Sequence, residues 1–193
     1  LTISFILFKA KSKVTGLVDK GADKGALILT ERTLKDAESG LDLATLTSTT
    51  FARGNGGYDG PSDEAPRPHK VPEREPDFAV DLTTLDMAAL IYRLSGDYNP
   101  LHASPSVARA AGFPKPILHG LCSLGVAGHA ILKGCCDYDA KRLKSLQLRF
   151  SSPVYPGETM RTEIWRDGAN ISFKSKIVER DVVVLDNGHA TVE

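Results

Sequence analysis

Apolar and polar side chains alternate with a period of two along the first quarter of the chain. This pattern predicts strands over residues 3–18 and 41–53, and the apolar run ALIL predicts another over 25–32. The stretch 19–25 contains two glycines and supplies a hairpin turn between the first two strands. No helical pattern lies between these strands, so we expect them to pair in antiparallel fashion.

Glycine, proline and charged side chains interrupt the alternation over residues 54–76 (GNGGYDGPSDEAPRPHKVPEREP). The fragment GNGG could suggest a dinucleotide-binding loop. Such a loop must open directly into a helix, however, and this one runs into prolines. We therefore interpret the stretch as loop and linker. The chain is divided accordingly into N-terminal strands at 1–60, a linker at 61–76 and a second domain at 77–193.

A helical spacing of apolar positions follows the linker. It predicts a helix over residues 81–94, with Thr83 or Thr84 as its cap. A short helix is expected over 105–111, where Ser104 is the cap and a proline occupies the first position.

A third helix, from about residue 119 or 120 to 133, is apolar nearly all round, which is typical of a buried helix. His129 lies inside it, and we interpret this residue as a core histidine. Period-two alternation then returns and predicts four strands, over residues 143–150, 158–165, 171–180 and 182–192. One long apolar helix on a curved antiparallel sheet is the hot-dog arrangement, of the α+β class.

Composition excludes several classes of function. The chain has 193 residues and a formal net charge of zero, so it lacks the basic excess that nucleic-acid binding requires. No apolar run reaches 18 residues, and no membrane span is expected. Its three cysteines are Cys122, Cys135 and Cys136, which read as reduced thiols. They form no CxxC pair, so no structural zinc site is expected.

The candidate chemistry lies on a loop between the first two predicted helices. Asp97, Asn99 and His102 are close together there, and Gly96 and Pro100 impose an irregular backbone. A carboxylate and an imidazole five residues apart on such a loop could both reach one water molecule. A polar surface turn that contains a histidine by chance is the alternative, and the residues alone leave it open.

Three segments resemble the hydratase 2 group of the MaoC-like dehydratase family: YRLSGDYNPLH at 92–102, PKPILHGLCSLG at 114–125 and RFSSPVYPGETM at 149–160. The resemblance covers roughly residues 77–192. The first part of the chain resembles the end of the non-catalytic N-terminal repeat found in eukaryotic double-hot-dog members. Its long helix is missing here, so the resemblance implies a double hot dog with an incomplete N-terminal repeat.

The resemblance implies hydration of trans-2-enoyl-CoA to (3R)-3-hydroxyacyl-CoA, and the reverse dehydration. Asp97 would act as a base towards a water molecule that His102 orients, with Asn99 positioning the water or the imidazole. Gly120 opens the third helix, so its free N–H could stabilise the negative charge on the thioester oxygen. A tight helix entry is the other interpretation of this glycine. No metal and no organic cofactor is expected, because adding water to an activated alkene involves no redox step.

An acyl-CoA substrate carries phosphates, and basic side chains near the site are candidates to bind them: Lys115, Arg142, Lys144 and Arg149. His119 precedes Gly120, where a structural capping role and a role in the site are both open. The resemblance also implies peroxisomal localisation, and we expect a homodimer. Two alternatives remain, namely an acyl-CoA thioesterase on the same fold and a non-enzymatic acyl-CoA-binding module.

Overall fold

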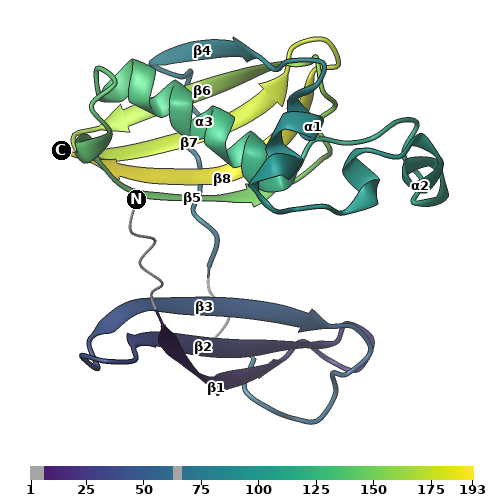
Figure 1. The fold of residues 1–193 in the computed structure, drawn as a ribbon, viewed down its shortest axis with the longest axis vertical. Coiled ribbons are helices and arrows are strands. Elements are labelled where there is room, and N and C mark those ends of the chain that lie inside the picture. Colours follow the sequence, from purple (N-terminus) through teal and green to yellow (C-terminus); the bar gives the residue numbers. More distant parts are fainter. Residues whose placement is uncertain (1–6, 63–66) are drawn as a thin grey trace. The chain divides into compact units, whose positions relative to one another are not determined.

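The computed structural model describes residues 7–62 and 67–193 (Figure 1). It divides the chain into two compact units, residues 1–67 and 68–193. The division falls inside the segment that the sequence analysis assigns to a linker. Each unit is described by itself below.

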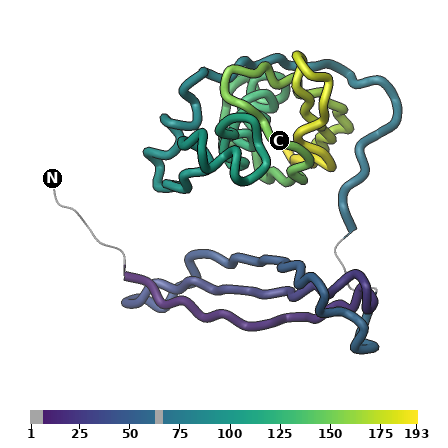
Figure 2. The backbone as a smooth tube through the Cα atoms, turned by 90° about the vertical axis from the view of Figure 1, so that its right-hand side faces the viewer, coloured from purple at the N-terminus to yellow at the C-terminus, as the bar shows by residue number. Residues whose placement is uncertain are grey.

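The first unit is a three-stranded antiparallel sheet with strand order β1-β2-β3. The strands are β1 (Phe8–Asp19), β2 (Ala26–Asp36) and β3 (Asp42–Ala52), and they run as a long ribbon in Figure 2. The three predicted strands and their antiparallel pairing are thus confirmed. Residues 3–6 of the first predicted strand lie outside the described part of the chain.

The glycine-rich GNGG segment closes one end of this sheet. The carboxylate of Asp19 accepts hydrogen bonds from the backbone N–H groups of Gly21 (2.8 Å) and Gly57 (2.7 Å). These bonds, that of Gly57 first, hold the pKa of Asp19 below its ordinary value. A methyl group on Gly56 would lie only 2.2 Å from the carbonyl oxygen of Gly21. The glycines therefore serve close backbone packing against the hairpin turn.

The second unit is a five-stranded antiparallel sheet, in the order β4-β6-β7-β8-β5, with one long helix on its face (Figure 1). The strands are β4 (Phe78–Thr83), β5 (Leu143–Phe150), β6 (Thr159–Asp167), β7 (Asn170–Ile177) and β8 (Val182–Val192), and the long helix is α3 (Gly120–Cys135). The α+β class and the hot-dog arrangement predicted from the sequence are confirmed.

Period-two burial explains how this core forms. In β7 the side chains of Ile171, Phe173, Ser175 and Ile177 are buried, and the residues between them are not. The three apolar ones pack with the buried face of α3, which includes Ile131, into one hydrophobic cluster. Strand β8 approaches β7 closely: a methyl group on its Gly188 would lie 2.4 Å from the carbonyl oxygen of Phe173. Only glycine is compatible with this spacing.

The end of the predicted linker packs on the same sheet. Trp165 donates its indole N–H to the carbonyl oxygen of Arg74 (2.7 Å). His69 bonds through its ring Nε2 to the hydroxyl of Ser172 (2.8 Å), and its ring lies 4.7 Å from that of His189. Residues 69–76 are thus part of the second unit rather than a free connection.

The prediction of a helix over 81–94 is wrong at its beginning. Residues up to Thr83 continue β4, which pairs with β6, and the helix α1 covers only Ala88–Tyr92 before a short 3-10 helix, η1 (Arg93–Ser95). Thr84 does not cap the helix. Its hydroxyl accepts from the Gly157 N–H and donates to the carbonyl oxygen of Glu158, both at 3.0 Å. Cross-strand pairing outweighs the helical spacing here.

The remaining helices follow the sequence more closely. A 3-10 helix, η2, spans Pro100–His102, and α2 (Pro105–Ala110) begins after Ser104 as predicted, although Ser104 makes no side-chain capping bond. A last 3-10 helix, η3 (Ala140–Arg142), precedes β5. None of the helices in the described part of the chain is both long and apolar enough to cross a membrane.

The helix α3 is buried on one side only. This corrects the prediction that the whole helix is buried and the interpretation of His129 as a core residue. Leu121, Gly125 and His129 are exposed, and their spacing of four residues places them on one stripe of the helix. His129 is therefore not a core histidine. Its ring lies 5.6 Å from that of Tyr138. The apolar composition of α3 hid this stripe, because two of its three members carry no charge or strong polarity.

Candidate active site

Two side-chain caps shape the loop that carries the candidate residues. Gly96 ends η1 with a φ of 115°, a conformation that favours glycine. Asp97 then accepts the N–H of Asn99 (3.2 Å), and the side-chain oxygen of Asn99 accepts the N–H of Leu101 (3.0 Å). The second bond starts η2 and thereby directs its last residue, His102. Asn99 thus acts on the imidazole through the turn that it caps.

His102 is held in one orientation by the backbone in front of α3. Its side chain is 9% exposed, and Nδ1 lies 2.8 Å from the carbonyl oxygen of Ile117. A carbonyl can only accept, so Nδ1 must carry a proton. In the neutral ring, Nε2 is then a free acceptor. An imidazole in this tautomer is suited to orient a water molecule or to take up its proton.

His119 lies directly against this pair. It is the residue that precedes α3, it is 1% exposed, and its ring stacks on that of His102 with centroids 3.7 Å apart and an interplanar angle of 26°. Its Nε2 lies 3.3 Å from the carbonyl oxygen of Asp97 and 4.0 Å from the Asp97 carboxylate. Burial lowers the pKa of His119 below its ordinary value, although the Asp97 carbonyl acts in the opposite direction.

The structure brings Asp97, His102 and His119 together. One oxygen or nitrogen atom from each lies within 4.8 Å of the others. Two acceptors that share one water are about 4.5 Å apart, since each hydrogen bond spans about 2.8 Å. A tetrahedral metal suits the set less well: stacked rings direct their in-plane lone pairs side by side rather than to one point, and His102 Nδ1 and His119 Nε2 already face carbonyl oxygens.

Gly120 begins α3 next to a cavity of about 300 Å³. Its N–H has no acceptor among the described residues, as expected for the first residue of a helix. The cavity is lined by Gly120 and His102, by three serines (Ser123, Ser151 and Ser152) and mostly by apolar side chains, among them Phe113, Ile117, Phe150 and Leu185. A methyl group on Gly120 would lie 3.3 Å from the ring of Phe150. The structure therefore places Gly120, whose amide is free, and His102 at one mainly apolar cavity.

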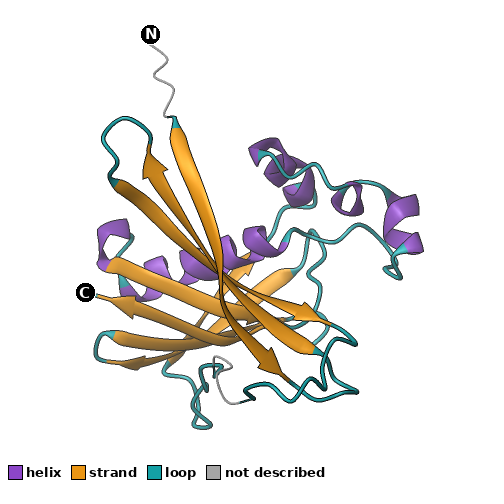
Figure 3. Cartoon of the chain, turned by 90° about the horizontal axis from the view of Figure 1, so that it is seen from below, coloured by secondary structure: helices purple, strands orange, loops and turns teal. Residues whose placement is uncertain are grey.

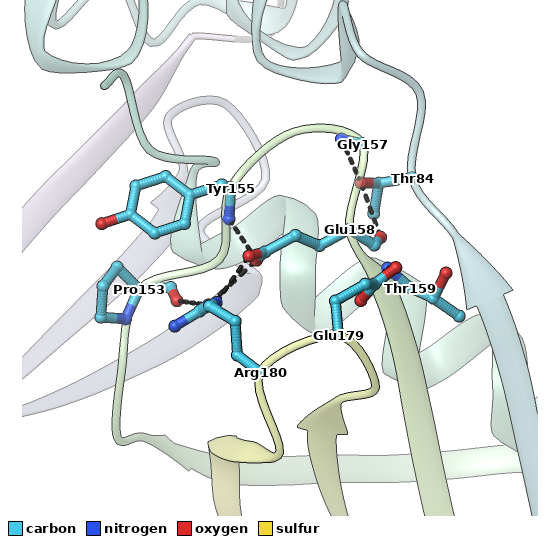
Figure 4. A network of polar contacts seen from close by, with 8 residues as sticks. All are labelled: Thr84, Pro153, Tyr155, Gly157, Glu158, Thr159, Glu179 and Arg180. Carbon is cyan, nitrogen blue, oxygen red and sulfur yellow. Dashed lines mark hydrogen bonds and ion pairs between the residues drawn. The ribbon is translucent and has the colours of Figure 1, made fainter. Parts of the chain in front are cut away.

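A network of polar contacts fixes the loop between β5 and β6, part of which lines this cavity (Figure 4). The Glu158 carboxylate accepts the backbone N–H of Tyr155 (2.8 Å) and two N–H groups of Arg180 (2.6 and 2.9 Å). Arg180 also donates to the carbonyl oxygen of Pro153 (2.9 Å). The next residue, Val154, accepts the N–H of Leu118 (2.7 Å). The loop and the chain entering α3 are thus held together.

The four basic candidates occupy different places. Lys115 lines a second cavity of about 300 Å³, which His102 also borders, and its ammonium group lies 5.4 Å from the centre of the Tyr155 ring. Arg149 is exposed on β5 beside Phe150. Arg142 and Lys144 lie at the other end of β5, where they pair with Asp137 (2.9 Å) and Glu193 (2.8 Å). Phe150, the last residue of β5, lines the cavity, so most of the length of the strand separates these two side chains from it, and they do not belong to the site.

The sequence left the role of His119 open and gave no sign of the loop network. The position of His119 next to Gly120 was the available signal, but only the structure shows its ring on His102. Glu158 and Arg180 gave no signal, because 21 residues separate them and an isolated ion pair has no sequence pattern.

Comparison with known proteins places the chain in a family. The MaoC-like domain model matches residues 68–188. "3-hydroxyacyl-thioester dehydratase Y" of Mycobacterium tuberculosis is 43% identical over 92% of this chain and 63% of its own length. "Probable enoyl-CoA hydratase 2" of Dictyostelium discoideum is 40% identical over 97% of this chain and 64% of its own length. The chain thus spans somewhat less than two thirds of these relatives.

Two solved structures of proteins with similar sequences also have folds similar to this chain. The crystal structure of a MaoC-like dehydratase from Phytophthora capsici aligns with a TM-score of 0.82 and 42% identity, over 96% of this chain and 64% of that one. Full-length peroxisomal multifunctional enzyme type 2 from Drosophila melanogaster aligns with a TM-score of 0.79 and 39% identity, over 96% of this chain and 34% of that one. With a family model over more than half of its residues and the expected hot-dog core, the chain belongs to the MaoC-like domain family.

Proposed function

We propose that the protein is an (R)-specific trans-2-enoyl-CoA hydratase. One observation carries the proposal: atoms of Asp97 and His102 lie within 4.8 Å of each other, and His102 and the free amide of Gly120 border one apolar cavity. The names of the relatives, enoyl-CoA hydratase 2 and 3-hydroxyacyl-thioester dehydratase, support the same chemistry.

In the proposed reaction, Asp97 and His102 share one water molecule. Asp97 takes a proton as the water oxygen bonds to C3 of the enoyl group, while the bare Nε2 of His102 orients the water. The electron pair of the C2–C3 double bond moves towards the thioester oxygen and forms an enolate. A proton delivered from the pair to C2 then restores the thioester. The atoms of one water are added and nothing is oxidised or reduced.

Gly120 would stabilise the enolate. Its N–H lies at the positive end of α3, a helix of 16 residues, and is free to donate to the thioester oxygen. A preorganised donor of this kind contributes about 3 kcal/mol in enzymes that stabilise an oxyanion during acyl transfer. A side chain at this position would approach the Phe150 ring and narrow the space for the thioester.

An acyl-CoA thioester is the proposed substrate. The mainly apolar lining of the Gly120 cavity suits an acyl chain, and the second cavity that His102 borders carries Lys115. Lys115 and the exposed Arg149 are the proposed contacts for the negatively charged end of CoA. Arg142 and Lys144 are no longer candidates.

The larger organisation is also a proposal. Residues 1–60 would be part of a non-catalytic hot-dog repeat, 61–76 a linker whose end packs on the second sheet, and 77–193 the catalytic repeat of a double hot dog that assembles as a homodimer. Peroxisomal localisation is proposed because some relatives are named as peroxisomal, such as "Enoyl-CoA hydratase 2, peroxisomal" of Arabidopsis thaliana.

A spectroscopic assay tests the activity. On adding crotonyl-CoA, we expect the absorbance of the conjugated enoyl thioester to fall as water adds to the double bond. With saturated butyryl-CoA, we expect no release of free thiol. Unchanged enoyl absorbance would contradict the proposal, and thiol release from butyryl-CoA would favour a thioesterase instead.

A further inference from the structure

We propose that His119 is a positioning residue that locks both Asp97 and His102 in their working geometry. The inference rests on the proposed function and adds a residue that acts through the reacting pair rather than on the substrate. Two contacts and one position carry it. The ring of His119 stacks on His102, its Nε2 bonds to the backbone of Asp97, and the residue lies at the start of α3.

The hydrogen bond ties the Asp97 loop to the helix. His119 Nε2 faces two oxygens of Asp97, the carbonyl at 3.3 Å and the carboxylate at 4.0 Å. Both are acceptors, so Nε2 must carry the proton. The side chain of Asp97 is 54% exposed and has little packing to hold it. This bond therefore ties a loop residue to the start of the long helix α3.

The ring of His119 covers one face of the His102 ring and restrains it. Nδ1 of His102 is bonded to Ile117, which restrains the ring within its plane but leaves it free to tilt about that bond. The His119 ring, 3.7 Å away at 26°, blocks the tilt on one face, and Tyr92 in turn packs against His119 with ring centroids 4.7 Å apart. Nε2 of His102 thus keeps its direction towards the shared water.

The surroundings of His119 favour the neutral ring. Its Nδ1 is buried and has no hydrogen-bond partner among the described residues. A bare lone pair is tolerated there better than an unpaired N–H, because a buried donor without an acceptor is costly. The charged or titratable groups that face it are Asp97, His102 and Arg93, and of these only Asp97 would favour a proton. The two stacked histidines therefore hold opposite tautomers.

Two substitutions separate the two contacts. His119→Phe keeps a stacked ring and removes the Nε2–H donor, whereas His119→Gln keeps an amide N–H and removes the ring. With crotonyl-CoA, we expect His119→Phe to lower kcat about 100-fold, the effect of a small misplacement of reacting groups, while KM stays nearly constant. His119→Gln should recover part of that kcat. His129→Phe and His129→Gln, on the exposed stripe of the same helix, are the matched controls and should leave both constants unchanged.

Wild-type kcat in His119→Phe would overturn the inference, as would a rise in KM that accounts for the whole loss. Trp165 fluorescence, from the single tryptophan in the chain, checks that each variant is folded. A readout independent of activity is the tautomer, measured by nitrogen-detected NMR of the imidazoles. We expect Nε2–H for His119 and Nδ1–H for His102, and the Nδ1–H tautomer at His119 would overturn the inference even if the hydratase assay succeeds. If the wild-type chain does not hydrate crotonyl-CoA, the proposed function fails, and the tautomers still decide the geometry.

Discussion

The two units contain strands of the same pattern but differ sharply in burial. In β3 of the first unit, ten of the eleven residues are exposed, whereas β7 of the second unit buries every other residue. The described part of the first unit, residues 7–62 and 67, consists of strands and loops, and the helices belong to the second unit (Figure 3). Alternation predicts a strand in either case. The apolar side chains of that pattern become buried only where a second layer, here α3, covers the sheet.

Catalysis gives the largest expected contrast between the units. Asp97→Asn in the second unit should lower kcat for crotonyl-CoA at least 100-fold, because the amide cannot take a proton from water. Asp42→Asn, in an exposed pair with Lys35 of the first unit, is the matched control and should leave kcat unchanged. The two variants are compared by enoyl absorbance under the same conditions. Equal activity of Asp97→Asn and Asp42→Asn would place the chemistry elsewhere.

The same truncation in the two sheets measures the difference in burial. Phe173→Ala removes a side chain that is 0% exposed and should lower the free energy of unfolding by about 3–5 kcal/mol. Phe51→Ala removes one that is 49% exposed, and should cost under about 1 kcal/mol. Urea unfolding followed by Trp165 fluorescence and by far-UV circular dichroism provides both values. Similar losses would mean that the first sheet is as well covered as the second.

The close approach of the β7 and β8 backbones should have a smaller effect on the free energy of unfolding. Gly188→Ala puts a methyl group 2.4 Å from the Phe173 carbonyl oxygen and should destabilise the second unit by about 1–3 kcal/mol. Gly125→Ala, whose methyl group meets no atom within 4 Å, should be neutral or slightly stabilising, since alanine favours a helix. Thermal unfolding of the two variants checks this, and a neutral Gly188→Ala would show that β8 can move away from β7.

Mild acid should act on one unit only. All five histidines lie in the second unit, and burial lowers the pKa of His119. The unfolded chain then binds a proton more readily than the folded one, so this contribution to stability is complete above about pH 6.5 and declines as the pH falls below it. Urea midpoints at pH 7.5 and 5.5, read from Trp165, should differ less in His119→Phe than in the wild type. An identical difference would exclude His119 as the source.

Stronger acid should act on both units, with the smallest effects. The pKa of Asp77 is lowered to about 2, first by its bond to Arg74, and that of Asp19 is lowered by backbone N–H groups of the first unit. Each contribution is present above about pH 4 and is lost as the pH falls towards the folded pKa. Asp77→Asn should flatten the acid response of Trp165 fluorescence and Asp19→Asn should not. A flattened response in both variants would mean that the two units unfold as one, and a flattened response in Asp19→Asn alone would contradict the assignment to Asp77.

The sequence predicted the strands of both units well, because period two survives in each. It failed at Thr83 and Thr84, where a cap signal and a strand compete and pairing with β6 decides the outcome. It failed again at His129, since an apolar composition does not reveal which stripe of a helix faces solvent. Asp97 and His102 could be named from the loop, but the stacked ring of His119 depends on a contact between residues 17 positions apart, which no local pattern encodes.

Hydration in ¹⁸O-labelled water tests most directly whether Asp97 and His102 activate one water molecule. We expect the wild-type chain to place ¹⁸O in the 3-hydroxyl group of a product with the R configuration, and Asp97→Asn and His102→Gln to place almost none there. Label found instead in a free carboxylate, or a labelled 3-hydroxyl product formed equally well by Asp97→Asn, would contradict this account.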